Sequence, residues 1–404
     1  MKSVFKFWFA MISTSLKGSK SYYLWLGFLS IWMILGGIHY YDQFTQGLVV
    51  TNLVDEVSWG AYIANFTFLV GVAAAAVLLV FPAYVMGDHD IHEVVLVGEI
   101  LAFSAVVLCL LFIMVDLGSP LNFLHIIPGI GRLNFPESVL AWDVLVINGY
   151  LLLNLHIPFY TLYCLYMGKK PQKKYYLPFV FISIFWAISL HTVTAFLYSG
   201  LGGRPFWNSA VLAPRFLVSA FAGGPLILMF VFYLIDKNWK HFPVKKHVFD
   251  YLIKVARVML PLNSFLLFCE VFKEFYTDSA HVASAQYLFT GLNGFHMLTP
   301  YIWGALIFEL FTMIVIFRDS SRKKPVLFLS ACILGFIGIW VEKGMGLIIP
   351  GFVPSSLGSI IEYIPSTHEF FICLGIWSFG ALLFTMMAKA ATSIMSGKVL
   401  YKSE

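Results

Sequence analysis

Long apolar runs, separated by short polar connections, dominate the pattern of the chain. A helix of about 20 mostly apolar residues crosses the hydrocarbon core of a bilayer, and this criterion selects ten segments. They lie at residues 21–41, 57–81, 91–117, 138–167, 176–200, 209–235, 249–276, 295–317, 325–350 and 368–392. The pattern therefore predicts an all-α polytopic membrane protein with ten transmembrane helices.

The composition supports this interpretation and excludes several classes of protein. Of the 404 residues, 60% are hydrophobic and 12% are charged, and the mean hydropathy is +0.84. A soluble protein of this size needs far more charge to cover its surface. A cytosolic enzyme, a nucleic-acid binder and a disordered scaffold are therefore excluded, and we expect the lipid bilayer, not a nucleic acid, as a partner.

The basic residues alternate between the two sides of the predicted membrane protein. Lys and Arg accumulate on the cytoplasmic side of membrane proteins. One side holds the basic clusters within residues 2–20, 169–174, 237–246, 318–324 and 389–402, whereas the other holds only Arg132, Arg204, Arg215, Lys273 and Lys343. We expect a multi-pass protein of the cytoplasmic (inner) membrane with both termini cytoplasmic. The N-terminal apolar stretch lacks a small-residue cleavage site, so we expect the first span to be retained.

The chain is expected to form one integral membrane domain over residues 1–404. Small residues in spans two and six, among them Gly71 and Gly224, permit close helix contact, and the two spans share an orientation. This favours two four-helix bundles, spans 2–5 and 6–9, flanked by spans 1 and 10. The predicted parts are a cytoplasmic segment at 1–20, the first span and outer loop at 21–56, the bundles at 57–208 and 209–350, and an outer loop, last span and tail at 351–404.

Polar residues at membrane depth are costly and usually face a bundle interior or water, so they are the candidate functional residues. Asp116, Asp143 and His191 converge on the outer third of consecutive spans, and such groups are suited to the oxygens of a quinone. Quinol oxidation releases two protons and needs an acceptor beside the ring oxygen, so these three are candidate catalytic residues. The candidate quinone-binding residues are Tyr62, Asn65, Tyr198, Arg204 and Arg215. Interhelical hydrogen bonds and charges at helix ends are the structural alternative.

A second polar series leads toward the cytoplasm. Polar groups in series are what a proton relay needs, although scattered structural polar residues are an alternative. The candidate proton path consists of Glu99, Asn148, Asn154 and His156 in the first bundle and Asn263 and Glu309 in the second.

Metal, haem and cluster sites are not expected. The five cysteines stand singly in apolar runs without a C-x-x-C pair. The mid-span pair His156 and His191 is offset by roughly 7 Å in depth, which does not suit a transmembrane haem. His89 and His92 belong to an inner loop or helix start with solvated charge. We therefore predict no haem, no iron–sulfur cluster and no metal in this chain.

Several stretches resemble the NrfD-like family, the membrane subunits of polysulfide reductase. Their order and spacing are similar across spans two to six, and the later half is similar in topology. The stretches are Trp59–Phe66 with Leu69–Gly71, Asp116–Pro120, Ser138 with Trp142–Asp143, His191–Phe196, and Trp207 with Ala213–Ala220. Ten spans resemble the subgroup of alternative complex III and the Hmc and Qrc complexes. Glu270–Tyr276 looks most like the Hmc membrane subunit and the P subunit of the Dsr sulfite-reduction-associated complex.

The resemblance implies a membrane subunit without a redox centre of its own. It implies exchange of electrons between menaquinone, bound as substrate, and a ferredoxin-like multi-cluster iron–sulfur subunit on the outer face. A multihaem cytochrome c and further membrane or cytoplasmic redox subunits would complete the complex. The family's quinone site, near the outer ends of the first bundle, corresponds here to Tyr62, Asn65, Asp116, Asp143, His191 and Tyr198. Some members have His in span two where this chain has Asn65 or Phe66. Coupling to proton movement has been proposed for the family.

Two other functions compete with this interpretation. A structural anchor for redox partners would need no quinone site, and Asp116, Asp143 and His191 would then be replaceable. A secondary transporter would also suit ten helices, but transporters show matched Gly or Pro breaks in both halves. Pro225 and Pro261 lack clear partners of this kind. Direction of electron flow depends on partners that the sequence does not contain.

Overall fold

Ten long apolar helices occur among the residues that the structure describes, as the hydrophobic pattern predicts. The computed structural model describes residues 2–127, 129–277 and 282–401, and no strand occurs among them. The helices that are long and apolar enough to cross a membrane are α2 (Lys20–Gln46), α3 with α4 and η2 (Ala61–Val85), α6 (Val95–Asp116), α7 (Val139–Tyr166), α8 (Lys173–Ser199), α9 (Leu212–Asn238), α10 (Lys246–Thr277), α12 (Thr299–Phe317), α14 with α15 and η5 (Pro325–Phe352) and α16 (Thr367–Met395). The protein is an all-α polytopic membrane protein.

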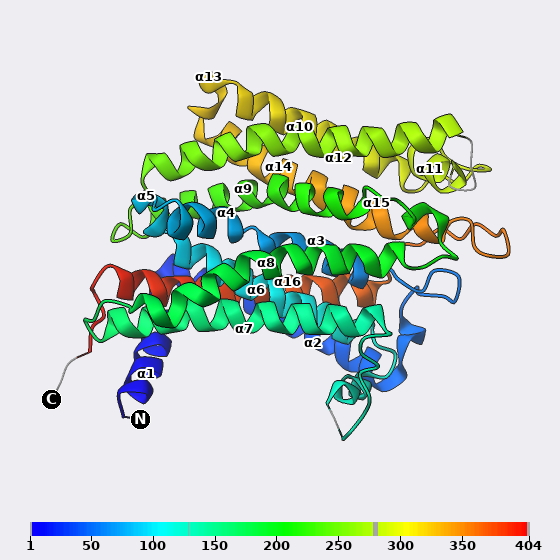
Figure 1. Cartoon of the computed structure of the whole chain (residues 1–404). Helices are drawn as coiled ribbons and strands as arrows, with labels where there is room; N and C mark the ends of the chain where they lie inside the picture. Colours follow the sequence, from blue (N-terminus) through cyan, green and yellow to red (C-terminus); the bar gives the residue numbers. More distant parts are fainter. Residues whose placement is uncertain (1, 128, 278–281, 402–404) are drawn as a thin grey trace.

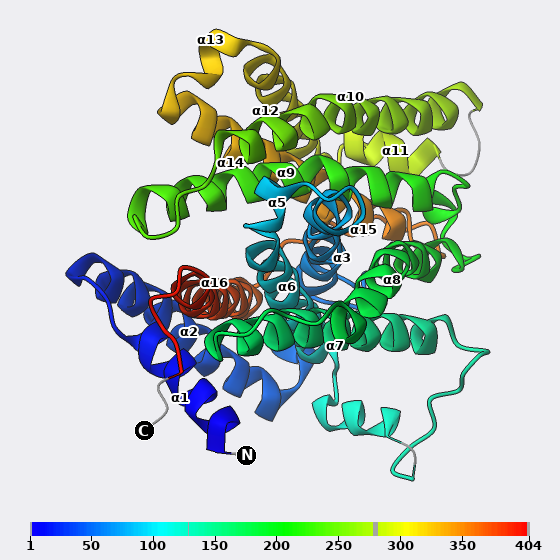
Figure 2. The ribbon, with the colours of Figure 1, turned by 60° about the vertical axis from the view of Figure 1, so that its left-hand side comes forward.

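The spanning helices form two groups that pack side by side. The helices α3, α6, α7 and α8 contact one another as a first bundle, and α9, α10, α12 and α14 form a second. The bundles meet where α9 packs on α3 and α8 (Figures 1 and 2). Small residues allow this approach, because a Cβ on Gly224 would lie 2.8 Å from the Cβ of Ala75, and one on Gly71 would lie 3.6 Å from the Cα of Ala220. The predicted close contact of spans two and six is therefore made between these two spans.

The first and last spans lie together on the first bundle and do not enclose the molecule from two sides. α2 packs along α16, and α16 packs on α6, α7 and α3. The N-terminal segment, for which the sequence predicts only a cytoplasmic location, forms helix α1 (Lys2–Leu16) against α16 and α7. The Phe7 ring is buried against the rings of Tyr163 and Tyr166, whereas Phe5 and Phe9 are exposed. α1 therefore packs on the bundle surface through the face that carries Phe7, and its opposite face exposes apolar side chains.

Two spans are interrupted within the array. Span two leaves regular helix after α3 (Ala61–Ala74), resumes as α4 (Val77–Val80) and ends in the wider turn η2 (Phe81–Val85), which contains Pro82. Span nine breaks at Gly344, between α14 (Pro325–Lys343) and α15 (Met345–Ile348), before η5 (Pro350–Phe352). A Cβ on Gly344 would lie 2.6 Å from the Trp340 carbonyl oxygen. The break therefore requires a residue without a side chain.

The two ends of the helix array differ in structure. Both termini lie at one end (Figure 1), together with the connections 86–94, 167–172, 239–245 and 318–324, and we call this the basic end. The opposite end, the loop end, consists of residues 47–60, 117–127, 129–138, 200–211, 282–298 and 353–366. It carries the short helices η1 (Leu48–Val50), η3 (Pro120–Ile126), η4 (Pro205–Trp207) and α11 (Val282–Phe289), whereas the basic end carries α5 (His89–His92) and α13 (Asp319–Arg322).

Candidate functional site

One face of α8 carries a polar stripe into the first bundle. His191, Thr194 and Tyr198 are buried and recur at the spacing that places side chains on one side of a helix. The Thr194 hydroxyl donates to the Asp143 carboxylate of α7 at 2.8 Å. One turn nearer the loop end, the Tyr198 hydroxyl is hydrogen-bonded to the Thr67 hydroxyl of α3. The stripe therefore joins three helices of the bundle through side-chain hydrogen bonds.

Two of the three candidate catalytic residues hold polar atoms without a partner. His191 places Nδ1 3.0 Å from the Ala187 carbonyl oxygen, which accepts only from a protonated nitrogen, so this contact leaves Nε2 as an acceptor in the neutral ring. His191 Nε2 and Asp116 Oδ1 are buried and make no hydrogen bond within the described part of the chain. Burying such a polar atom costs free energy unless a hydrogen-bond partner satisfies it. A ligand bearing hydroxyl groups would satisfy these two atoms.

Tyr62 and Asn65 already have protein partners. The Tyr62 hydroxyl donates to the Gln43 side chain of α2 at 2.6 Å. The Asn65 side-chain oxygen accepts from the indole N–H of Trp340 at 3.0 Å and of Trp377 at 2.8 Å. Asn65 thus links α3 to α14 and α16. The structure gives both residues a bridging role between spans, the alternative that the sequence leaves open.

The two candidate arginines lie away from the α8 stripe. Arg204, in the connection after α8, places its guanidinium 4.5 Å from the centre of the Phe352 ring. Partial desolvation lowers the pKa of this guanidinium. Arg215 begins α9 and points into the second bundle, where it pairs with Glu270 of α10 and with Glu342 of α14. Arg215 therefore belongs to a different polar group from Asp143 and His191.

The second bundle contains a buried polar network to which all four helices contribute. Beyond the ion pairs of Arg215, the Asn263 amide donates to Glu342 at 2.8 Å and lies 3.4 Å from Glu309. Arg215, Glu270 and Glu342 also line a recess with about 320 Å³ of empty space, which Glu274 and residues of α11 border. The candidate residues Asn263 and Glu309 thus lie together, and their neighbours continue toward the loop end.

Lys343 connects this network to the interface between the bundles. It follows Glu342 in sequence, but its ammonium group donates to the Phe216 carbonyl oxygen at 3.1 Å and lies over the Phe216 ring. It lines a small cavity, with about 200 Å³ of empty space, where Gly71 of α3 faces Ala220 and Gly223 of α9. Adjacent residues of α14 therefore face the second bundle and the interface, immediately before the break at Gly344.

The remaining residues of the candidate proton path do not form a hydrogen-bonded series in the described structure. Glu99 is buried, and neither carboxylate oxygen has a partner. Asn148 and Asn154 donate to carbonyl oxygens of their own helix, at Val144 and Tyr150. His156 is exposed on α7, where its Nε2 lies 3.0 Å from the Tyr175 carbonyl oxygen. Of these four, His156 lies outside the bundle interior.

The comparisons with known proteins give the family. The pattern of the family described as polysulphide reductase, NrfD, matches residues 49–354, which is more than half of the chain. The chain belongs to this family. The match contains both bundles and ends before α16, and it begins after α2. The helices α2 and α16 therefore lie outside the matched residues, beside the eight spans that match.

Three similar proteins cover nearly the whole chain. The Hdr-like menaquinol oxidoreductase integral membrane subunit of Archaeoglobus fulgidus is 22% identical over 372 residues, covering 88% of this chain and 89% of its own length. The menaquinone reductase integral membrane subunit of Nitratidesulfovibrio vulgaris is 23% identical over 390 residues, covering 90% of each chain. A putative membrane subunit of dimethyl sulfoxide reductase from Halobacterium salinarum is 22% identical over 409 residues, covering 89% and 88%.

Several hydrogen-bond partners of the candidate residues in this NrfD protein, among them Thr194, Gln43, Thr67 and Glu342, were not among the predicted site residues. Thr194 follows His191 by three residues and precedes Tyr198 by four, so helical periodicity from those two residues is the signal that points to it. Gln43 and Thr67 have no such signal, because their partners lie in other spans. In the sequence, Glu342 can be identified only as an ionisable residue near the end of a predicted helix. Its ion pair with Arg215 depends on how two distant spans pack.

Proposed function

We propose that this protein is the quinone-interacting membrane subunit of a respiratory redox complex. It exchanges electrons between menaquinone and an iron–sulfur subunit on the outer face. Membership of the NrfD family and the similarity to proteins named menaquinol oxidoreductase and menaquinone reductase membrane subunits support this function. A multihaem cytochrome and further redox subunits complete the proposed complex.

The observation on which the proposal chiefly rests is the unpartnered Nε2 of His191 beside the Asp143–Thr194 pair. A neutral imidazole nitrogen accepts a hydrogen bond from a quinol hydroxyl and takes its proton as the ring is oxidised. Asp143, held by Thr194 at 2.8 Å, is the proposed second proton acceptor. Asp116, at the loop end of α6, offers Oδ1 as the exit for protons toward the outer surface. The residues present therefore fit a bound quinol head group.

Proton movement is assigned to the second bundle as part of the same proposal. Arg215, Glu342, Asn263 and Glu309 form contacts in series from the recess near the loop end into the bundle. Lys343 lies between this series and the first bundle. A change of charge at the quinone would act on the Lys343 ammonium group and, through the adjoining residue Glu342, on the series. This route is the proposed coupling element.

The proposed orientation places the basic end in the cytoplasm and the protein in the inner membrane. Lysine-rich connections remain on the cytoplasmic side during insertion, and all the clusters lie at the end that holds both termini. The loop end then faces outward. The iron–sulfur partner docks on that end, above the α8 stripe.

Quinone binding to the purified complex tests the function. Quenching of a fluorescent hydroxyquinoline N-oxide, an analogue of menaquinol, should be saturable for the wild type. Asp143→Asn and His191→Gln should weaken it by at least about tenfold, which corresponds to roughly 1.4 kcal/mol.

Two threonines of α8 provide a matched control. Thr194→Val removes the hydroxyl that holds Asp143, whereas Thr192→Val removes a hydroxyl that bonds only its own helix on the exposed face. We expect weaker binding for the first and wild-type binding for the second. Saturable binding that is unchanged in Asp143→Asn and His191→Gln would place the quinone elsewhere. No binding by the wild type would favour a structural anchor and contradict the proposal.

A further inference from the structure

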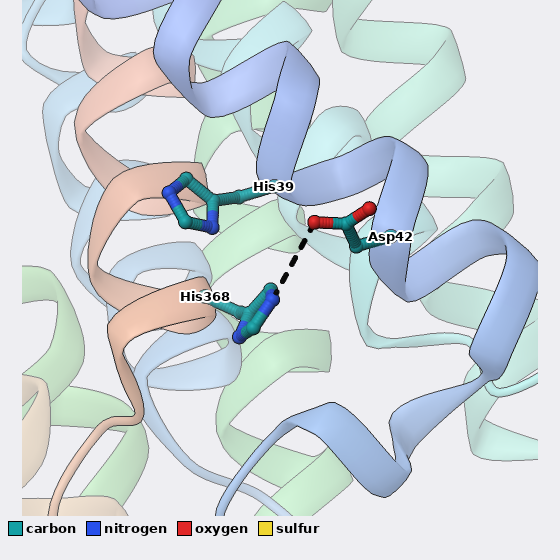
Figure 3. Close-up of side chains that lie close together, drawn as sticks. All are labelled: His39, Asp42 and His368. Carbon is teal, nitrogen blue, oxygen red and sulfur yellow. Dashed lines mark ion pairs between the residues drawn. The ribbon is translucent and has the colours of Figure 1, made fainter.

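Three side chains with metal-ligating groups meet between the first and last spans. His39 and Asp42 lie on α2, and His368 lies at the start of α16. Their ligand atoms are all within 4.8 Å of one another, and Figure 3 shows the three side chains directed into one space between the helices. The cluster lies at the loop end, outside the residues 49–354 that match the NrfD family. The cluster shares no residue with the proposed quinone site.

The side chains of His39, Asp42 and His368 point toward one another but form no hydrogen bond with one another. The nearest approach of His368 Nε2 to the Asp42 carboxylate is 3.7 Å, which is longer than a hydrogen bond. His39 Nδ1 is buried and has no hydrogen-bond partner within the described residues. All three residues are half-buried. His368 and Asp42 form an ion pair at this distance (Figure 3), so His39 Nδ1 is the atom of the cluster that lacks the partner that would normally explain its burial.

The close crossing of α2 and α16 fixes the backbone positions of the residues that form the cluster. A Cβ on Gly36 would lie 2.7 Å from the Cα of Gly375, so α2 and α16 touch through their backbones one turn below His39. The His39 ring stacks on Phe371 of α16, with centroids 4.7 Å apart. Rigid helices that meet at a close contact hold ligands more precisely than loops do.

The start of α16 is also held firmly. Ser366 and Glu369 form a reciprocal capping box around the first turn, where His368 lies. Glu369 also accepts from the backbone N–H of Asn52 at 2.9 Å and from the Tyr363 hydroxyl. The position of His368 is therefore set by contacts that do not involve its own side chain.

We propose that His39, Asp42 and His368 bind a divalent transition-metal ion, with Zn²⁺ as the best match. Two imidazoles and one carboxylate are a common donor set for this ion, with water as the fourth ligand. Ligand atoms at about 2.0–2.1 Å from a tetrahedral centre are about 3.4 Å apart. The ligand atoms of the cluster lie within 4.8 Å of one another, so binding would draw them closer together.

The bound ion ties α2 to α16 at the outer surface. These two helices lie beside the NrfD core, and the ion would add a direct link between them at the end opposite to their basic connections. This inference differs from the sequence-based expectation of no metal. That expectation weighed the pair His156 and His191 and the group around His89, and it did not bring together residues that are more than 300 positions apart.

Zinc binding to the full chain in detergent, after treatment with a chelator, tests the site. The wild type should bind one Zn²⁺ per chain and show a higher Tm with zinc. Asp42→Asn, His39→Gln and His368→Gln should each weaken binding by at least about tenfold. Co²⁺ in the same site should show the ligand-field bands of a four-coordinate ion without thiolate charge-transfer absorption, which distinguishes it from binding by the native cysteines.

His125→Gln is the matched control, because His125 is an exposed histidine of the same end. It should bind zinc as the wild type does. The metal-free Tm of every variant should equal that of the metal-free wild type, so that loss of binding is not loss of the fold. Zinc binding that persists in His368→Gln, or no stoichiometric binding by the wild type, would overturn the proposal. The proposed quinone binding should be unaffected by His368→Gln, so the two proposals can fail separately.

Discussion

At the scale of single residues, Arg215 is the side chain whose loss should cost most stability. It is buried and pairs with Glu270 and Glu342, both of which are buried as well. Arg215→Gln leaves these carboxylates without their cation, and breaking a buried ion pair in this way costs about 3–5 kcal/mol. Thermal unfolding of the purified chain should show a large drop in Tm.

A second substitution distinguishes loss of charge balance from loss of packing. Adding Glu342→Gln to Arg215→Gln removes one of the unpaired carboxylates, so the double variant should be more stable than the sum of the single changes predicts. Arg204→Gln is the control, since Arg204 stacks on Phe352 and makes no ion pair in the described structure; about 0.5–1 kcal/mol is expected. Equal losses for Arg204→Gln and Arg215→Gln would contradict this explanation.

Asp88 at the basic end should make stability depend on acid pH. Burial alone raises its pKa, but hydrogen bonds from the His247 ring and from the backbone N–H groups of Ile91 and Asp90 outweigh that effect and lower the pKa below the usual value. A carboxylate with a lowered pKa stabilises the fold above its unfolded-state pKa, and this contribution disappears as the pH falls through the lowered value. The Tm of Asp88→Asn should lie below that of the wild type at pH 7, and the difference should close below about pH 4. Asp55→Asn, in an exposed loop residue, should show no such difference.

Residue identities at the site were predictable to different degrees. Asp143 and His191 stand out because polar groups are rare in apolar spans, and the structure buries both. Arg215 was predicted to belong to the same group, whereas its ion pairs lie in the second bundle, and its role at a quinone stays a prediction. Local sequence cannot show that Asn65 accepts from two tryptophans, since those contacts join residues 275 and 312 positions apart.

At the scale of helices, the crossing of α2 and α16 depends on Gly36. Its missing side chain allows the backbones to touch, since a Cβ there would lie 2.7 Å from the Gly375 Cα and 2.8 Å from the Phe371 carbonyl oxygen. Backbone atoms cannot rotate away as side chains do, so Gly36→Ala must push the helices apart, at a cost of about 1–3 kcal/mol. It should also weaken zinc binding at the neighbouring cluster. Gly37→Ala, where a Cβ meets nothing within 4 Å, should leave both Tm and zinc binding at or above the wild-type level.

The spanning helices were predictable as elements, but their irregularities were not. All ten predicted spans exist as helices. A segment of about 20 apolar residues in hydrocarbon can satisfy all its backbone hydrogen bonds within itself only as a helix. The break of span nine at Gly344 depends on contacts with Trp340 and with the Ala64 backbone, so composition does not reveal it. Helix α1 is too short to span and was overlooked for that reason.

At the scale of the whole molecule, α3 packs with α6, α7 and α8, and α9 packs with α10, α12 and α14. The division of the chain into the predicted parts stays a prediction. The packing of α2 and α16 together on the first bundle was not predictable, because hydropathy gives the number of spans but not their neighbours. The consequence is asymmetric. Among the described helices, α2 and α16 pack on the first bundle rather than on the second.

The orientation of the molecule leads to a prediction about labelling from outside the cell. Every lysine-rich connection lies at the basic end, and moving any of them across the membrane would be opposed by its charge, so the loop end should face outward. Leu121→Cys, exposed in η3, should react with a membrane-impermeant thiol reagent on intact cells, whereas Lys170→Cys should react only after the cells are opened. The native chain, whose cysteines all lie within spans, serves as the unlabelled reference. The reverse pattern would place the candidate quinone residues near the cytoplasmic surface, and an iron–sulfur partner would then have to dock from inside.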